Sequence, residues 1–331
     1  MCTAVSWNSG CHYFGRNLDL EHSYREAVTV TPRNYPFTFG RLPVMERHYA
    51  MIGMATAVEG YPLYYEATNE MGLSMAGLNF PGLAHYSMPV NGKDNVASFE
   101  LIPWILGQCS CVKEAKELLE RINITADAFS AEYKPTPLHW MIADSDHSIT
   151  MEAMEDGLRI HDNPIGVLTN NPPFEYHLYH LRDYMHVSPV PSENRFAQQA
   201  QLTPYSNGMG GIGLPGDFSS ASRFVRAAFI KLNSRCEETE EGAVSQFFHI
   251  LSGVAMPRGS VLIPPDQYEI TLYSCCCNTD QGIYYYTTYD NSRITAVELH
   301  TENLNGEQII TYPLRTAGDI YRENRKLSAD S

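Results

Sequence analysis

The sequence lacks the features of a membrane-bound or exported protein. None of its apolar runs is long enough to span a bilayer, and it does not begin with the basic and then apolar segments of a secretory signal. It also lacks an excess of positive charge, because 23 lysines and arginines stand against 38 aspartates and glutamates, for a net charge of −15. This balance argues against binding to nucleic acid or to anionic membranes. We therefore expect a cytoplasmic protein that binds neither.

Patterns typical of metal and phosphate sites are missing as well. The eight cysteines include no C-x-x-C pair, and no pair of histidines completes a zinc pattern. In a cytosolic chain most of these cysteines should be reduced thiols, and the run at residues 275–277 fits small buried residues of a strand. The glycine-rich stretch 208–217 does not match a phosphate-binding loop. We expect no metal and no cofactor.

The sequence also has no internal repeat, no linker and no strict alternation of strands with helices. Its 331 residues, 44% hydrophobic and 18% charged, are enough for a large core. Runs of strand pattern are followed by runs of helix pattern, which is typical of an α+β fold with layered, mainly antiparallel sheets. We expect one domain over residues 1–331. The expected strands are residues 26–31, 49–58, 63–68, 72–78, 138–143, 148–152, 157–161, 268–277, 282–289 and 294–300, and the expected helices are 98–106, 111–122, 174–185, 220–233 and 244–254.

What the sequence does contain is a cysteine directly after the initiator methionine. Removing Met1 would leave Cys2 with both a thiol and a free α-amine. An unperturbed thiol titrates at about 8.5 and an α-amine at about 7.7–8.0, so the amine is partly neutral near neutral pH and can accept the thiol proton. The alternative is an ordinary chain start, and Cys2 alone would favour that alternative.

The residues that follow favour the chemical interpretation. Residues 3–7 and 12–20 read as two strands joined by a turn at residues 8–10, which is a hairpin. The hairpin returns Arg16 and Asp19 to the neighbourhood of Cys2. A carboxylate can orient an amine, and a guanidinium can hold a thiolate. The two residues are three apart, so a bend near Asn17 would be needed to bring both to one face of the strand. The alternative for this pair is a surface ion pair.

Two turns carry amide side chains that could stabilise an oxyanion. Asn79 ends an expected strand just before a Pro-Gly turn, and Asn170 and Asn171 lie in the turn before a pair of prolines. The alternative is that they are simple turn residues. The histidines of the helix expected at 174–185 and just beyond it, His177, His180 and His186, have no evident carboxylate partner, so we expect them at the surface.

Taken together, these segments resemble the choloylglycine hydrolase family, which includes bile salt hydrolases and penicillin V acylases and belongs to the N-terminal-nucleophile hydrolases. The resemblance covers essentially the whole chain. The resembling segments are MCT at 1–3, FGRNLD at 14–19, GLNFP at 77–81, LHW at 138–140, GVLTNNP at 166–172, GLPGD at 213–217, SRF at 222–224 and GIYYY at 282–286.

The resemblance implies the roles of the site residues. It makes Cys2 the nucleophile with its own amine as base, supported by Arg16 and Asp19. It places Asn79 and Asn170 around the oxyanion, with Asn171 as the alternative to Asn170, and it adds Arg223 as a further arginine of the site. It also suggests that an apolar trough for a steroid is formed by Leu18, Val58, Phe129, Tyr133 and Leu138, for which the alternative is ordinary core packing.

The resemblance further implies a four-layer αββα sandwich, a homotetramer, and hydrolysis of the amide that joins a bile acid to glycine or taurine. Asn79 within the segment GLNFP resembles the bile salt branch, since penicillin V acylases commonly have tyrosine there. Two alternatives remain open. One is an acylase for penicillin V or an N-acyl homoserine lactone, and the other is a non-catalytic steroid-binding protein on the same fold, which would need none of Cys2, Arg16, Asp19 and Asn79.

Overall fold

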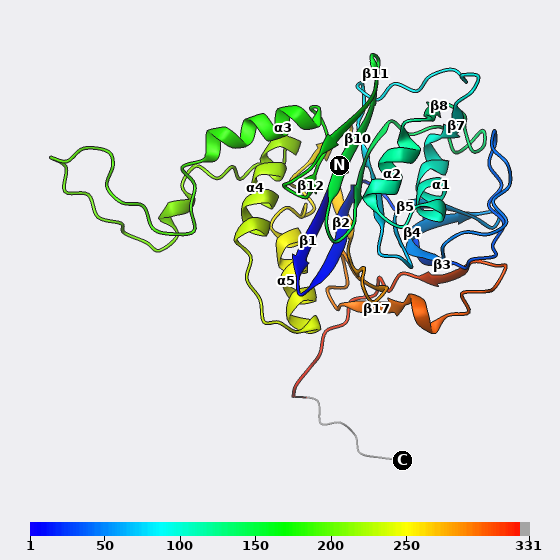
Figure 1. Cartoon of the computed structure of the whole chain (residues 1–331). Coiled ribbons are helices and arrows are strands. Elements are labelled where there is room, and N and C mark those ends of the chain that lie inside the picture. The colour runs from blue at the N-terminus through cyan, green and yellow to red at the C-terminus, as the bar shows by residue number, and fades with distance from the viewer. Residues whose placement is uncertain (325–331) are drawn as a thin grey trace.

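The computed structural model describes residues 1–324, which contain two large antiparallel sheets (Figure 1). The first sheet has six strands and includes the N-terminal hairpin. In spatial order its strands are β12 (Val167–Leu168), β1 (Cys2–Ser9), β2 (Cys11–Leu20), β15 (Ile270–Asn278), β16 (Ile283–Thr288) and β17 (Thr295–Glu298). The first two strands along the chain therefore lie near the middle of this sheet, next to strands from the end of the chain.

The second sheet has eight strands. In spatial order they are β11 (Gly157–Asp162), β10 (Ser148–Met154), β9 (Leu138–Ala143), β6 (Ser74–Asn79), β5 (Tyr61–Asn69), β4 (Met51–Val58), β3 (Ala27–Thr31) and β18 (Ile310–Pro313). Two small pairs complete the strands: β7 (Asp94–Ala97) runs parallel to β8 (Ile122–Thr125), and β13 (Leu262–Ile263) forms a hairpin with β14 (Gln267–Tyr268).

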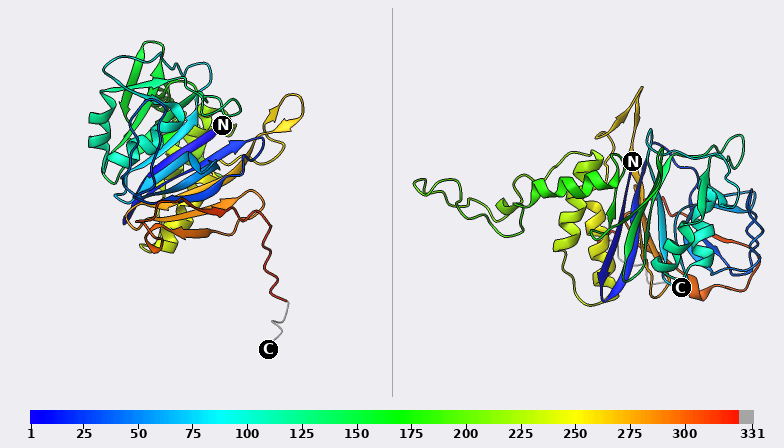
Figure 2. Two further views of the ribbon diagram at one scale, coloured as in Figure 1. Left: turned by 90° about the vertical axis from the view of Figure 1, so that its right-hand side faces the viewer. Right: turned by 45° about the horizontal axis from the view of Figure 1, so that its top comes forward.

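Helices cover the outer face of each sheet, so the molecule has four layers (Figures 1 and 2). Helices α4 (Ser220–Asn233) and α5 (Glu240–Ser252) pack on the six-stranded sheet, with α3 (Phe174–His180) against α4. Helices α1 (Leu101–Gln108) and α2 (Val112–Leu119) lie on the side of the eight-stranded sheet. The expected α+β class and αββα layering are confirmed. No helix of the described chain is long and apolar enough to cross a membrane.

Alternation along the strands divides the apolar side chains between two cores. Met141 and Ile142 are neighbours on β9, yet Met141 belongs to the core shared with the six-stranded sheet and Ile142 to the core under α1 and α2. Successive side chains of a strand point to opposite faces, so a strand with a layer on each side must be apolar at nearly every position. The ten expected strands are confirmed, with ends that differ by a few residues.

The helix expected at residues 111–122 is wrong at its C-terminal end. Helix α2 stops at Leu119, and Ile122 begins β8. The β-branched residues of β8 find backbone partners in the parallel strand β7, which a single-sequence pattern does not reveal. Ser110, just before α2, accepts no hydrogen bond from the first turn of the helix. Its N–H and hydroxyl donate to the Glu114 carboxylate.

Gly15 allows β2 and β15 to lie unusually close. A Cβ atom at Gly15 would lie 1.9 Å from the backbone oxygen of Cys275, so no other residue fits without moving the strands apart. The next residue, Arg16, pairs directly with Cys275 in the register of the two strands. The glycine therefore fixes where Arg16 stands relative to β15.

Candidate active site

Cys2 opens β1 at the end of the six-stranded sheet and is almost fully buried. The hairpin register pairs Cys2 with Leu18 and Ala4 with Arg16. Directly paired residues of an antiparallel sheet share a face, as do residues two apart on one strand. The side chains of Cys2 and Arg16 therefore lie on the same face of the sheet, the one that packs on the eight-stranded sheet.

Arg16 is completely buried and is held by the facing sheet. Its Nη1 donates to the carbonyl oxygens of Gly77 (2.6 Å) and Tyr65 (3.2 Å), and lies 3.8 Å from a carboxylate oxygen of Glu66. Its Nη2 is buried without a hydrogen-bond partner in the described chain. Burial by itself lowers the pKa of Arg16, but nearby acidic groups, Cys2 first, raise it further than burial lowers it. The guanidinium is therefore a fixed positive charge beside the Cys2 thiol.

Asp19 lies on the opposite face of β2 from Arg16, as the spacing predicts for a strand without a bend near Asn17. Strand β2 pairs without interruption through Asp19, and the irregularity lies in β15, between Thr271 and Tyr273. The Thr271 hydroxyl donates to Asp19 Oδ1 (2.6 Å), while Oδ2 is buried without a partner in residues 1–324. Burial raises the pKa of Asp19, and Arg223 and the terminal amine oppose this. Arg16 and Asp19 thus lie near the end of the hairpin on opposite faces of the six-stranded sheet.

The terminal amine of the described chain belongs to Met1 and lies beside Asp19. It donates to the Asp19 carbonyl oxygen (2.7 Å) and forms an ion pair with Glu269. Burial lowers the pKa of this amine, and Cys2 and Asp19 partly oppose the decrease. A free amine on Cys2 would lie one residue deeper, where the Cys2 nitrogen already donates to Asn170 Oδ1 (2.9 Å).

Asn170 is the junction of the site, since its backbone and side chain bond to several segments of the chain. Its partners are Ser220 Oγ for the N–H (2.8 Å), His177 Nε2 for the carbonyl (2.9 Å), Cys2 N and Arg223 Nη2 for Oδ1 (2.9 and 2.7 Å), and the Asn79 carbonyl for Nδ2 (2.7 Å). Asn171 instead donates to the Pro81 carbonyl (2.8 Å). The contact with Cys2 is therefore made by Asn170. Asn79 Oδ1 is buried without a partner in the described residues.

Arg223 connects helix α4 to the start of β1. It is completely buried, and its Nη1 donates to the Cys2 carbonyl oxygen and to Thr3 Oγ1 (2.7 Å). Ser219 caps the helix by accepting from the Ser222 N–H, which sets the first turn that carries Arg223. Burial lowers the pKa of Arg223, and the acidic groups of Asp19 and Cys2 oppose this.

Two buried histidines hold the backbone on which Asn170 stands, and the sequence analysis missed both. His177 donates from Nε2 to the Asn170 carbonyl, and His139 donates from Nε2 to the Thr169 carbonyl (both 2.9 Å). The expectation that His177 lies at the surface is therefore wrong, although His186 is exposed. Phe174 and His177 are three apart on α3, so both lie on its buried face. That spacing was the signal available in the sequence.

Two of the five candidate trough residues are paired directly with residues of the site, and the other three are not. Leu18 pairs with Cys2, and Leu138 pairs with Asn79. The rings of Phe129 and Tyr133 are 6.2 Å apart in the loop before β9. Val58 ends β4 and pairs with Tyr61, and the ring centroids of Tyr61 and Phe129 are 5.4 Å apart. Val58 is therefore linked to the other candidates only through Tyr61.

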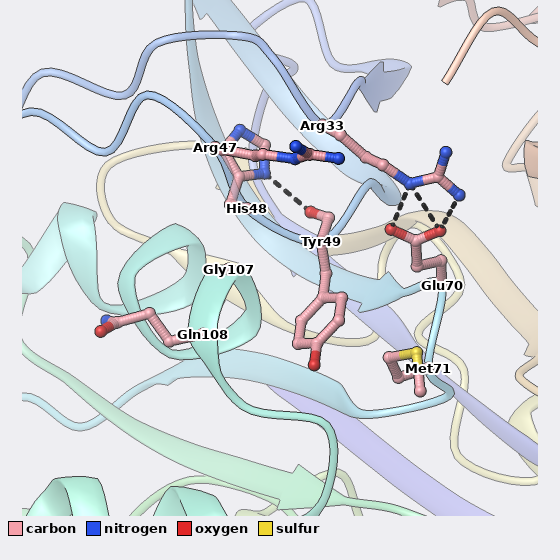
Figure 3. Close-up of a pocket in the computed structure, with 8 residues that line it drawn as sticks. All are labelled: Arg33, Arg47, His48, Tyr49, Glu70, Met71, Gly107 and Gln108. Atoms are coloured by element: carbon pink, nitrogen blue, oxygen red, sulfur yellow. Dashed lines mark hydrogen bonds and ion pairs between the residues drawn. The ribbon is translucent and has the colours of Figure 1, made fainter. Parts of the chain in front are cut away.

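A separate hollow of about 570 Å³ lies at the other end of β6 (Figure 3). Its lining residues are Arg33, Arg47, His48, Tyr49, Glu70, Met71, Gly107 and Gln108. Strand β6 begins near Glu70 and ends at Asn79, beside Asn170, so the length of this strand separates the hollow from Cys2. Residues 1–324 contain no group of three or more histidine, cysteine, aspartate or glutamate side chains that could hold a metal ion.

Residues 2–312 match the family model for linear amide C–N hydrolases of the choloylglycine hydrolase family. A bile salt hydrolase/transferase of Lactiplantibacillus plantarum is 51% identical over 98% of this chain and 100% of its own length. One from Clostridium perfringens is 39% identical over 94% of this chain and 96% of its own.

Solved structures give the same result. A mutant conjugated bile acid hydrolase from Clostridium perfringens superposes with a TM-score of 0.91 at 37% identity, covering 98% of this chain and 100% of that one. A penicillin V acylase from Agrobacterium tumefaciens has a TM-score of 0.71 at 20% identity, covering 94% of this chain and 90% of that one, which shows a common fold.

The buried state of His177 predicts a loss of stability in acid. Burial lowers the pKa of His177 to about 4, below its ordinary value of 6.5. Between pH 6.5 and pH 4 the His177 ring is protonated in the unfolded chain but neutral in the native protein. The free energy of unfolding should therefore fall as the pH falls from 6.5 towards 4. The contribution of this one group is roughly 3 kcal/mol. Urea unfolding at about pH 7 and about pH 4.5 measures it.

The matched variants are His177→Gln, whose amide can still donate to Asn170, and His186→Gln on the surface. The first should lose less stability on acidification than the unmodified protein, and the second should lose the same amount. His12, whose pKa burial also lowers to about 4, will keep part of the dependence in both. An equal acid loss in His177→Gln and the unmodified protein would contradict this prediction.

Proposed function

Because the chain belongs to the choloylglycine hydrolase family of linear amide C–N hydrolases, we propose that it cleaves the amide joining a bile acid to glycine or taurine. The observation that carries this proposal is the 51% identity, over 98% of the chain, to a bile salt hydrolase/transferase. The chain is thus a bile salt hydrolase that releases free bile acid and an amino acid. We further propose that residues 1–331 act as one catalytic domain in the cytoplasm, without metal or cofactor.

We propose the following roles for the catalytic residues. Once Met1 is removed, the Cys2 amine takes the thiol proton and the sulfur attacks the amide carbonyl. Asn79 and Asn170 stand beside the developing oxyanion. The N–H of Asn170 already donates to Ser220, and one hydrogen of its Nδ2 donates to the Asn79 carbonyl, so the second Nδ2 hydrogen is the donor left to take part. The protonated amine then gives its proton to the departing glycine or taurine, and water activated by the same amine hydrolyses the thioester.

The charged residues keep this machinery in place. Arg16 stands beside the thiol and supports the thiolate. Asp19 favours the protonated amine and orients it, and Arg223 fixes the Cys2 carbonyl together with Asn170. The full set argues against a non-catalytic steroid-binding protein, because binding a steroid requires none of these buried charges.

The steroid is proposed to lie in a trough formed by Leu18, Val58, Phe129, Tyr133 and Leu138. Leu18 and Leu138 are supported by their pairing with Cys2 and Asn79. An acylase for penicillin V or an N-acyl homoserine lactone would share the catalytic residues and differ in this trough, so the choice between the substrates is a matter of apolar contact.

We propose that the protein assembles as a homotetramer through an arm formed by residues 185–208. The arm extends away from the body between α3 and α4 (Figure 1). Its exposed apolar residues are Met185, Val190, Phe196, Leu202 and Tyr205. A group of exposed apolar side chains of this kind is typical of a surface that binds protein, and the symmetric partner available to every copy is another copy of the chain.

The first prediction of this proposal concerns the substrate. Glycine- and taurine-conjugated bile salts should be cleaved with a higher kcat/KM than penicillin V. A steroid buries far more apolar surface than a phenoxyacetyl group, and at about 25 cal/mol per Å² the difference amounts to several kcal/mol before ordering costs. Ninhydrin detection of released glycine or taurine, with Cys2→Ala as the inactive control, measures it. A higher kcat/KM for penicillin V would overturn the bile salt assignment in favour of the acylase.

The second prediction concerns the position of Cys2. A form with an uncleavable extension before Cys2 should fold and be inactive, because the Cys2 nitrogen is then an amide without a basic lone pair. Losing general-base help costs about 10²–10⁴-fold, and the extension would also crowd the site. Proteolytic trimming back to Cys2 should restore activity, with intact mass and amino acid release measured before and after. An extended form that turns over at the rate of the trimmed one would rule out the amine as the base.

The third prediction concerns the arm. Light scattering should give the mass of four chains for the unmodified protein and a smaller mass for the double variant Phe196→Ser, Tyr205→Ser, which removes two of the most exposed apolar side chains. Met88→Ser, at an exposed position outside the arm, is the control and should leave the mass unchanged. A single-chain mass for the unmodified protein would refute the tetramer, and an unchanged mass for the double variant would refute the role of the arm.

A further inference from the structure

A carboxylate that the proposed mechanism does not use lies behind Arg16. Glu66 belongs to β5 of the eight-stranded sheet and is only 2% exposed. Its Oε2 lies 3.8 Å from Arg16 Nη1. Among the ion pairs of residues 1–324, this is the one that joins Arg16 to a carboxylate. Glu66 therefore reaches across the space between the two sheets towards the residue that flanks the Cys2 thiol.

Three donors from the six-stranded sheet converge on this carboxylate. The Tyr273 hydroxyl donates to Oε2 (2.8 Å), the Tyr284 hydroxyl donates to Oε1 (2.6 Å), and the Cys275 thiol donates to Oε1 (3.5 Å). Tyr273 and Cys275 are two apart on β15, so both project from the same face. Cys275 is also the residue paired with Arg16. Burial raises the pKa of Glu66, and Arg16 and these three donors oppose this by favouring the ionised carboxylate.

The two sides of Arg16 are unlike. On one side Nη1 contacts Glu66 and donates to the Gly77 carbonyl. On the other, Nη2 is buried with no hydrogen-bond partner in the described part of the chain. Cys2 is the acidic group that acts most strongly on this guanidinium. The Tyr65 and Gly77 carbonyls and the Glu66 carboxylate thus all lie at Nη1, and Nη2 is the nitrogen without a partner in the described residues.

We propose that Glu66 is a positioning residue for Cys2 chemistry, holding Arg16 in place and limiting how strongly its charge stabilises the thiolate. The inference rests on the proposed function only in that Cys2 is taken as the nucleophile. A buried guanidinium without its counter-ion is free to move to other acceptors. A thiolate that is stabilised too strongly attacks more slowly, because intrinsic nucleophilicity falls with the thiol pKa. Glu66 opposes both the movement of the guanidinium and the excessive stabilisation of the thiolate.

The chain offers a matched control in Glu240. Its carboxylate also accepts from two tyrosine hydroxyls, those of Tyr13 (2.8 Å) and Tyr285 (2.9 Å). It has no salt bridge with an arginine in the described residues, and it belongs to α5 on the outer face of the six-stranded sheet. Glu66→Gln and Glu240→Gln each neutralise a carboxylate that accepts from two tyrosine hydroxyls. Glu66 is buried and Glu240 is half-buried, and only Glu66 lies beside Arg16.

The experiment measures the pH dependence of Cys2 alkylation by iodoacetamide in the mature protein, read by mass spectrometry of the N-terminal peptide. Glu66→Gln should lower the midpoint of alkylation by about one pH unit, because removing a nearby negative charge stabilises the thiolate. Its kcat for a conjugated bile salt should fall by about 10²-fold with little change in KM, since Glu66 holds Arg16 and does not touch substrate. Glu240→Gln should change neither.

The double variant Tyr273→Phe, Tyr284→Phe tests the same inference without deleting the carboxylate. It removes two hydrogen bonds that favour the ionised form of Glu66, so the alkylation midpoint should move in the same direction by a smaller amount. If Glu66→Gln does not fold, as judged by circular dichroism, this variant decides the question. An unchanged alkylation midpoint in a folded Glu66→Gln, or in the folded double variant if Glu66→Gln is unfolded, would overturn the inference. An unmodified protein that alkylates normally but cleaves no bile salt would overturn the proposed function and leave the alkylation test intact.

Discussion

The site depends on one constraint, which is that β2 is buried on both faces and nevertheless carries two charged residues. Arg16 projects into the space between the sheets and Asp19 towards the helices, so each must find polar partners within its own layer. The eight-stranded sheet supplies the carbonyls and the carboxylate that meet Arg16, and the irregularity in β15 brings Thr271 to Asp19. Both sheets and helix α4, which carries Arg223, therefore contribute to the electrostatics of a single hairpin end.

Asn170 shows how the layers are locked together at that end. Helix α3 provides the donor to its carbonyl, helix α4 provides Ser220 and Arg223, and the end of β6 provides the carbonyl of Asn79. Polar groups in such networks polarise one another and are costly to leave unpaired, so the arrangement has few alternatives of similar energy. The geometry around Cys2 is thus a consequence of packing helices and sheets, and not of the hairpin alone.

The parts of this arrangement that could be predicted from sequence are those with a local signal. Strand patterns predicted most strands of both sheets, and the cysteine after Met1 indicated the chemistry of the hairpin. The roles of Arg16 and Asp19 came from the resemblance to the family. Glu66 and His177 gave no such signal, because each acts through a partner distant in sequence: Arg16 lies 50 residues from Glu66 across two sheets, and His177 reaches Asn170 only once α3 folds back. The opposite faces of Arg16 and Asp19 follow from their spacing, whereas the irregularity in β15 gave no signal in the sequence.

Chemistry and substrate choice are carried by different kinds of structure. The residues around Cys2 stand on paired strands and on the first turn of a capped helix, where backbone hydrogen bonds fix their positions. The trough candidates Phe129 and Tyr133 lie in a loop, and Val58 lies at a strand end, where changes of sequence cost little stability. A fold of this kind can keep one amide-cleaving centre while its loops change the acyl group that is bound.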